Sequence, residues 1–214
     1  MALPPDTAES FVREVDENLR RDQMAERAKR YGGLVAGAVV LFLVAVGGYL
    51  FWQHRQQLKA EAGTEQLATT LQDIGSNQAA TAPARLDSLR QSDVDGVRAT
   101  AGLSRAALAV QQGDRKRAAA VYAEIAADDG LSQPFRDLAT VRGTALEYDT
   151  LKPDDVIARL QPIATPGQPF FGSAGEMIGM ALIAKGQKPA AAQLFAKIAA
   201  DKGVPDSLRS RAVQ

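Results

Sequence analysis

Few residues of this chain have types and spacings that could support catalysis. The single histidine, His54, lies at the end of a long apolar stretch, so neither a histidine-based triad nor a multi-histidine metal site can be built within one chain. Two acidic pairs, Asp128-Asp129 and Asp154-Asp155, have the carboxylates that general acid–base chemistry uses. Each pair falls at the end of a predicted helix, where Asp stabilises the terminus, so we interpret both pairs as solvated caps.

The other candidate motifs lack essential residues. Residues 91–96, QSDVDG, resemble the start of a calcium loop, but Gln91 occupies the first ligand position and Gly102 the last, where Glu is needed. The chain has no Gly-rich phosphate loop followed by Lys, and no Cys for disulfides or thiolate metal sites. We therefore predict no catalytic residue, no metal site and no cofactor.

The composition also excludes one class of partner. The 214 residues include 25 Lys and Arg and 25 Asp and Glu. This balance provides no basic surface for the phosphate backbone, so we expect no nucleic-acid partner.

An uncharged apolar stretch, residues 31–53, determines where the rest of the chain lies relative to a membrane. A helix of that length rises roughly 34 Å, against a bilayer hydrocarbon core of about 30 Å. The rings of Tyr31, Tyr49 and Trp52 fall near its ends, where amphipathic rings favour the membrane interface. A soluble core helix is seldom apolar on every face over this length. The stretch therefore predicts a single transmembrane helix in contact with membrane lipid.

A cleaved signal peptide is the alternative to a permanent anchor. Its apolar region is about 7 to 15 residues long and is closely followed by a small-residue cleavage site. Residues 60–62, AEA, have the cleavage pattern, but they lie well beyond an apolar stretch that is already too long. We expect an uncleaved anchor.

Basic residues predict the orientation of this anchor. More of them precede the apolar stretch than follow closely behind it: Arg20, Arg21, Arg27, Lys29 and Arg30 before it, and Arg55 and Lys59 after it. Lys and Arg near a span are retained on the cytoplasmic side. We expect a cytoplasmic N-terminus and an exported C-terminal part, which in a bacterium is the periplasmic side of the inner membrane.

Residues 1–30 are predicted to form a cytoplasmic helical segment. Asp6 and Glu9 have the spacing of a capping box, and apolar residues recur every four positions from Phe11 to Leu19. We interpret this segment as a solvated helix that leads into the membrane. A docking surface for a cytoplasmic partner or for lipid headgroups is the alternative.

Residues 54–84 are predicted to form a helical stalk and a loop. Residues 56–74 contain no Pro and continue the helical spacing of Leu residues. Residues 75–83, GSNQAATAP, are small, polar and rich in helix breakers, which predicts the loop. The compact domain is then expected over residues 85–214.

That domain contains an internal repeat. Residues 118–130, AAAVYAEIAADDG, align without gaps to residues 191–203, AAQLFAKIAADKG, with eight of thirteen positions identical. Gly113 matches Gly186 at the same offset of 73. This offset is close to twice the roughly 34 residues of a tetratricopeptide unit, so a third unit should lie between the two copies.

The middle unit is weaker than its neighbours. Residues 134–148 and 153–163 are its two predicted helices, and DTLKPD is the turn between them. This turn has no Gly, and none of the three units carries the usual Trp near its start. The repeat pattern is therefore degenerate.

Two antiparallel helices pack closely only where small side chains face each other, and a tight turn between them needs Gly or a polar pair. We assign the small, turn, small and large positions in the first and last units, in that order. They are Ala106, Gly113, Ala118 and Tyr122 in the first unit, and Gly179, Gly186, Ala191 and Phe195 in the last. The predicted fold class is all-α: a single N-terminal transmembrane helix followed by a tetratricopeptide-like helical-hairpin solenoid.

Two features suggest contacts with other chains. Gly33, Gly37 and Gly48 lie on roughly one face of the apolar helix, where small residues let a second transmembrane helix approach. The frequent use of Gly in membrane helices is the alternative explanation. Near the C-terminal end, Leu208 and Val213 are candidates for unburied apolar residues, so a homo-oligomer is one interpretation and a shortened final helix is the other.

The whole arrangement resembles a known family. The segment FVREVDENLRRDQMAERAKRYG, residues 11–32, one span, and degenerate repeats ending in LIAKGQKPAAAQLF, residues 182–195, are similar to the YfgM-type ancillary subunits of the SecYEG translocon. The likeness extends over nearly the whole chain and rests on architecture and repeats rather than on a catalytic motif. It implies a periplasm-facing partner of the secretion channel that associates with a membrane-anchored periplasmic chaperone of the prolyl-isomerase type. It assigns no individual binding residue.

We therefore expect a membrane-anchored periplasmic scaffold for protein–protein interaction, not an enzyme. Its repeats would bind a chaperone or an emerging chain, and its anchor would raise the local concentration of that partner at the channel. Two alternatives stay open. One is an envelope scaffold for another machine, such as division-linked wall synthesis or cytochrome maturation, and the other is an enzyme without a recognisable site.

Overall fold

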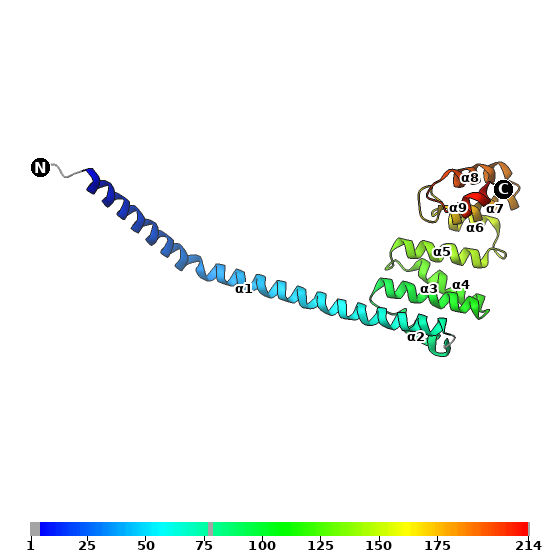
Figure 1. The fold of residues 1–214 in the computed structure, drawn as a ribbon, viewed down its shortest axis with the longest axis horizontal. Helices are drawn as coiled ribbons and strands as arrows, with labels where there is room; N and C mark the ends of the chain where they lie inside the picture. The colour runs from blue at the N-terminus through cyan, green and yellow to red at the C-terminus, as the bar shows by residue number, and fades with distance from the viewer. Residues whose placement is uncertain (1–4, 77–78, 214) are drawn as a thin grey trace. The chain divides into compact units, whose positions relative to one another are not determined.

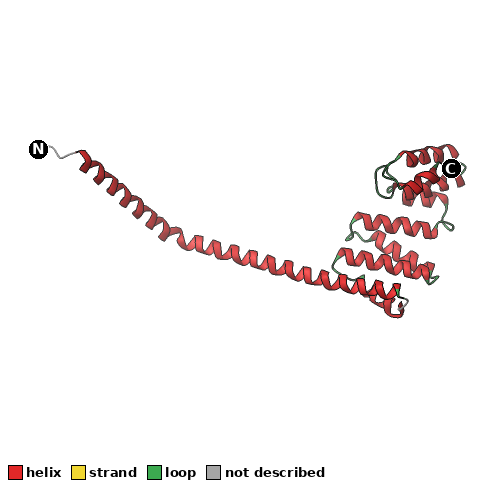
Figure 2. Ribbon diagram, in the orientation of Figure 1, coloured by secondary structure: helices red, strands yellow, loops and turns green. Residues whose placement is uncertain are grey.

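The structure, a computed structural model, describes residues 5–76 and 79–213, with side chains described between 29 and 213 except at 32, 35 and 77–79. Every regular element within these residues is helical (Figure 2). The side chains of the predicted capping box and of the apolar residues at 11–19 lie outside this description, as do residues 1–4 altogether.

Helix α1 runs from Pro5 to Gly75 (Figure 1). The chain divides into two compact units, Met1–Leu58 and Lys59–Gln214, and α1 contributes residues to both. The described apolar side chains of the first unit are exposed: Leu34 and Leu41 are each 72% exposed and Val44 is 69% exposed. Such exposure on every face is expected of a helix whose surroundings are lipid.

One helical segment among the described residues is long and apolar enough to cross a membrane. It lies within Ala36–Gly75, where the mean hydropathy of the best 18-residue window is 1.8 and none of that window is buried. This segment is a candidate membrane span near the N-terminus.

The second unit is built from helices that follow one another in antiparallel hairpins. After the end of α1 they are η1 (Ala79–Thr81), α2 (Ala82–Leu89), α3 (Asp95–Gln111), α4 (Arg115–Ala127), α5 (Gln133–Glu147), α6 (Pro153–Leu160), α7 (Phe171–Ala184), α8 (Lys188–Ala200) and α9 (Asp206–Ala212). Helix α4 packs against both α3 and α5, and α7 packs against both α6 and α8 (Figure 1). Three hairpins, α3–α4, α5–α6 and α7–α8, therefore form a stack, and the predicted all-α class with helical-hairpin repeats is confirmed.

The end of α1 is part of this stack. Leu67 of α1 is 8% exposed and joins a buried cluster with Leu86 and Leu89 of α2 and Val97 of α3. Residues 59–75, which the sequence assigns to the stalk, thus lie in the same compact unit as the repeats.

The turns of the first and last hairpins share one geometry. Gly113 has φ +79° and Gly186 has φ +76°, a left-handed conformation that costs other residues about 1–2 kcal/mol. In the first turn the amide N–H of Asp114 donates to the Ala109 carbonyl at 2.9 Å, and in the last turn the N–H of Gln187 donates to Leu182 at 2.8 Å. The same hydrogen bond therefore recurs 73 residues later.

The small positions lie where helices approach closely. Ala106 and Ala118 are fully buried, and Ala191 is 1% exposed. At Gly179 a Cβ would lie 2.5 Å from Cζ of Phe195, so no larger residue fits without a shift of that ring. The predicted large residue of the last unit thus packs on its predicted small residue.

The first helix of the middle hairpin, α5, begins and ends one residue earlier than predicted, and the second helix differs more. That second helix, α6, ends at Leu160 and not at Ile163. Gln161, the C-cap, keeps helical dihedral angles (φ −51°, ψ −43°), but Pro162 after it has no N–H with which to continue the helix. Helix α6 is therefore 8 residues long, whereas α4 has 13.

Leu208 and Val213 have different surroundings. Leu208 packs against the last hydrophobic cluster, whose buried members are Phe171, Ile198 and Val204. Val213 is 76% exposed.

Candidate functional site

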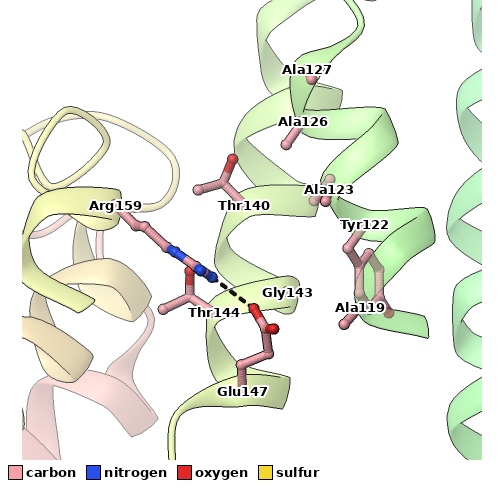
Figure 3. A pocket seen from close by; sticks show the side chains of 11 residues that line it. Ala119, Tyr122, Ala123, Ala126, Ala127, Thr140, Gly143, Thr144, Glu147 and Arg159 are labelled. Carbon is pink, nitrogen blue, oxygen red and sulfur yellow. Dashed lines mark hydrogen bonds and ion pairs between the residues drawn. The ribbon is translucent and has the colours of Figure 1, made fainter. Parts of the chain in front are cut away.

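A pocket of about 320 Å³ opens where α4, α5 and α6 meet (Figure 3). Alanine side chains and Tyr122 of α4 form one wall: Ala119, Ala123, Ala126 and Ala127 accompany Tyr122. Thr140, Gly143, Thr144 and Glu147 of α5 form the other wall, and Arg159 of α6 completes it. Four of the five α4 residues in the lining are alanines, and α6 contributes only Arg159.

The charged groups of this pocket form one ion pair. Nη1 of Arg159 donates to Oε2 of Glu147 at 2.7 Å (Figure 3). The two side chains are 44% and 37% exposed, and pairs this exposed contribute about 0–1 kcal/mol to stability. The pair is therefore weak, and a competing group can displace it.

Thr144 brings an unsatisfied polar group to the same wall. Its residue is 1% exposed, and its Oγ1 has no hydrogen-bond partner among the described residues. By contrast, Oγ1 of Thr140, one helical turn earlier, donates to the Arg136 carbonyl at 2.9 Å. A buried hydroxyl without a partner costs about 1–3 kcal/mol, so Thr144 is a feature that needs an explanation.

A second hollow of about 660 Å³ lies along α8. Its α8 residues are Ala192, Phe195, Ala196, Ala199 and Ala200. Each stands 73 positions after a residue of the α4 wall, at the offset of the sequence repeat. Ala212 and Val213 complete its lining, which contains no polar side chain. The repeat thus produces the same apolar helix face twice.

A cluster of arginines joins α2 to α3 and α4 at the other end of the stack. Asp87 accepts from Nη1 of Arg90 at 3.2 Å, from Nε of Arg105 at 3.3 Å and from Nη2 of Arg117 at 3.1 Å. Arg105 is only 4% exposed. Because a buried charge needs a partner, these contacts fix the packing of three helices.

Among the described residues, Tyr148 and Arg211 have a shifted pKa. Burial, with a smaller effect from the charge of Asp149, raises the pKa of the Tyr148 phenol. The two hydrogen bonds from the Arg211 guanidinium to Glu176, and the charge of that carboxylate, raise the pKa of Arg211. Neither shift brings a titration into the neutral range, so neither group behaves as an acid–base catalyst there.

The acidic pairs noted in the sequence lie at helix ends. Asp128 ends α4 and accepts from the Gly130 N–H at 2.9 Å, and Asp129 pairs with Arg136 at 2.7 Å. Asp154 and Asp155 lie in the first turn of α6. His54 lies on α1 and is exposed. Within the part of the chain that the structure describes, no group of His, Asp or Glu could hold a metal ion.

The glycines of the apolar helix have open surroundings. A Cβ placed at Gly33, Gly37 or Gly48 would meet nothing within 4 Å. Their contact with a second transmembrane helix stays a prediction. Near the end of the apolar stretch the rings of Tyr49 and Trp52 lie 6.4 Å apart, as interfacial aromatic residues can.

Sequence reasoning did not single out Thr144, Glu147 and Arg159. They lie on two helices of the degenerate middle unit, and no spacing rule connects them. A weak signal was present on the α4 side, since Ala119, Ala123 and Ala126 recur at helical spacing and recur again in the second copy.

A comparison with protein families supports these observations. Residues 28–214 match the family described as Tetratricopeptide repeat-like domain. Neither the curated proteins nor the solved structures gave a significant match. Helical repeats of this family are typically non-catalytic and indicate a scaffold for protein–protein interaction. This match includes the candidate membrane span and every helix of the stack. The chain therefore belongs to the tetratricopeptide repeat-like family.

Proposed function

We propose that this chain is a single-pass scaffold of the bacterial inner membrane that is ancillary to the SecYEG translocon and links it to a membrane-anchored periplasmic chaperone of the prolyl-isomerase type. One observation carries the proposal: a single chain joins an unburied apolar helix to a stack of helical hairpins from a family that binds proteins. The similarity of the architecture to YfgM-type subunits supplies the identity of the partners.

In this proposal the chain has four parts. Residues 1–30 are cytoplasmic, residues 31–53 span the membrane, residues 54–84 form the stalk and loop, and residues 85–214 are the periplasmic repeat domain. The excess of basic residues before the span supports this orientation, because Lys and Arg are retained on the cytoplasmic side.

The mechanism is recognition without reactive chemistry. An anchored domain meets its partners in the plane of the membrane, so its effective concentration at the channel is high even when each contact is weak. The hairpin stack supplies surfaces of two kinds, the partly enclosed pocket of α4–α6 and the open apolar face of α8. Glycines of the anchor supply a third surface, for a membrane helix of the channel.

Affinity capture from mild detergent tests whether the anchor binds the channel while the repeat domain binds the chaperone. The full-length protein is compared with a variant in which residues 31–53 are replaced by an unrelated poly-leucine span, and with the double variant Gly33→Leu/Gly37→Leu. We expect all three to recover the chaperone and only the natural anchor to recover the channel efficiently. Equal recovery of the channel by the replaced anchor would contradict a specific membrane contact. Recovery of cell-division or cytochrome-maturation proteins in place of the channel would assign the scaffold to another machine.

A further inference from the structure

We infer that the pocket between α4, α5 and α6 binds one large apolar side chain of an extended polypeptide segment. This inference rests on the proposed scaffold function and names the chemistry that one of its surfaces recognises. Neither the family match nor the sequence pattern assigns a ligand to this face of the stack.

The shape of the pocket specifies an apolar side chain. Its α4 wall consists of Tyr122 and alanines, and its volume of about 320 Å³ is at the small end of the roughly 300–1,000 Å³ typical of ligand clefts. Helix α6 has 8 residues against 13 in α4, and it contributes only Arg159 to the lining. Because this wall is apolar, the space suits an apolar side chain from another chain.

The unsatisfied hydroxyl of Thr144 favours an extended segment over a helix. A bound helix uses its own backbone N–H and C=O groups, whereas an extended segment presents them free. Oγ1 of Thr144 lacks a partner among the described residues and lies on the same face of α5 as Glu147. When the exposed Arg159–Glu147 pair moves aside, a backbone group of the bound segment can satisfy that hydroxyl, at little cost in ion-pair energy.

The α8 hollow provides a matched control. It repeats the alanine and aromatic wall at an offset of 73, and its lining has no threonine, glutamate or arginine. Ala123 and Ala196 occupy equivalent positions in the two walls, and both are exposed. A leucine at either position adds the same volume to the same kind of helix face, so only a leucine at Ala123 should block the inferred site.

The experiment uses the full-length chain in lipid nanodiscs. Because the natural sequence has no cysteine, Ala127→Cys at the exposed rim provides a single attachment point for a fluorophore. The probes are nine-residue Gly/Ser peptides with a central Phe, Leu or Ala. We expect the Phe and Leu peptides to change the fluorescence and the Ala peptide to bind about tenfold or more weakly, which corresponds to about 1.4 kcal/mol.

Two substitutions test the two parts of the inference. Ala123→Leu should reduce the affinity for the Phe peptide about tenfold or more, while Ala196→Leu should leave it within about twofold. Thr144→Val should raise the melting temperature, because it removes a buried unpaired hydroxyl, and should weaken peptide binding several-fold. If the role of Thr144 is only structural, Thr144→Val will raise the melting temperature and leave peptide binding unchanged. If Ala123→Leu does not fold, Ala127→Leu with the fluorophore at Ala119→Cys replaces it.

Three results would overturn the inference: no binding of the Phe peptide up to about 1 mM, equal binding by the Ala peptide, or equal effects of the leucines at Ala123 and Ala196. The same variants are also tested for capture of the channel and the chaperone. If the peptides do not bind but the channel and the chaperone are still captured, this inference alone is wrong. If the peptides bind but the natural protein captures neither the channel nor the chaperone, the proposed translocon role is wrong instead.

Discussion

Helices α4 and α8 present the same face in two different surroundings. The α4 face contains Tyr122, which is 5% exposed, and it is faced by α5 and α6 around a pocket of about 320 Å³. The α8 face contains Phe195 at the equivalent position, which is half-buried, and its hollow measures about 660 Å³. Residues that stand 73 positions apart thus form equivalent faces on α4 and α8. The degree to which each face is enclosed depends on the helices that pack next to it.

The difference between the two faces shows which structural features recur in each copy of the repeat. The turn conformation, the small contacts and the aromatic position recur because they depend on residues within one hairpin. The polar groups of the α4 pocket do not recur, because α5 and α6 supply them. A repeat protein of this kind can therefore diversify its binding surfaces by changing the length and sequence of one neighbouring helix.

Truncation of the two aromatic residues should show the largest difference between these regions. Tyr122→Ala is expected to destabilise the repeat domain by about 3–5 kcal/mol, because it removes a buried ring. Phe195→Ala should cost about half as much, since part of its ring already contacts solvent. Urea unfolding, with hydrogen exchange of α4 and α8 to locate the change, measures both. Equal costs would show that the two faces are equally enclosed.

A second pair of variants examines the small positions at the same offset. Gly179→Ala places a Cβ 2.5 Å from Cζ of Phe195, and overpacking of this kind costs about 1–3 kcal/mol. Ala106→Gly should cost about 1 kcal/mol, through helix propensity and lost burial. Urea midpoints provide the comparison. A more stable Gly179→Ala variant would mean that helix propensity outweighs the ring contact.

The turn glycines should behave alike in the two hairpins. Gly113→Ala and Gly186→Ala are each expected to cost about 1–2 kcal/mol, because both residues have positive φ. Gly96→Ala is the control: it lies in the first turn of α3 with nothing within 4 Å of its Cβ position, so alanine should be neutral or stabilising there. Thermal melting of the three variants tests this. A clear difference between the two turn variants would show that the hairpins are not equivalent.

The smallest expected effect is a pH dependence that comes from Tyr148, next to the middle hairpin. The raised pKa of Tyr148 means that the phenol ionises in the unfolded chain first as the pH rises. Its contribution to stability is therefore complete below about pH 10 and is lost as the pH rises through the folded-state pKa. Tyr148→Phe should flatten this decline in urea unfolding at alkaline pH. An unchanged profile would assign the decline to other groups.

The sequence predicted the features that depend on local residues. The apolar stretch, the turn glycines and the hairpin period follow from composition and spacing, and the first and last copies of the repeat could be aligned directly. The end of α6 was placed three residues too late, although the reason, Pro162, is visible in the sequence. The candidate pocket could not be predicted, because Thr144, Glu147 and Arg159 come together only when α5 and α6 pack, and their charges and hydroxyl have no sequence spacing in common.

The proposed function requires that one apolar helix hold the repeat domain on the periplasmic side of the membrane. Single cysteines introduced at Ser10 and Ser132 of the otherwise cysteine-free chain are treated with a membrane-impermeant maleimide in intact spheroplasts. The account predicts rapid labelling of Ser132→Cys, and labelling of Ser10→Cys only after the membrane is disrupted. Labelling of Ser10→Cys alone in intact spheroplasts would contradict it.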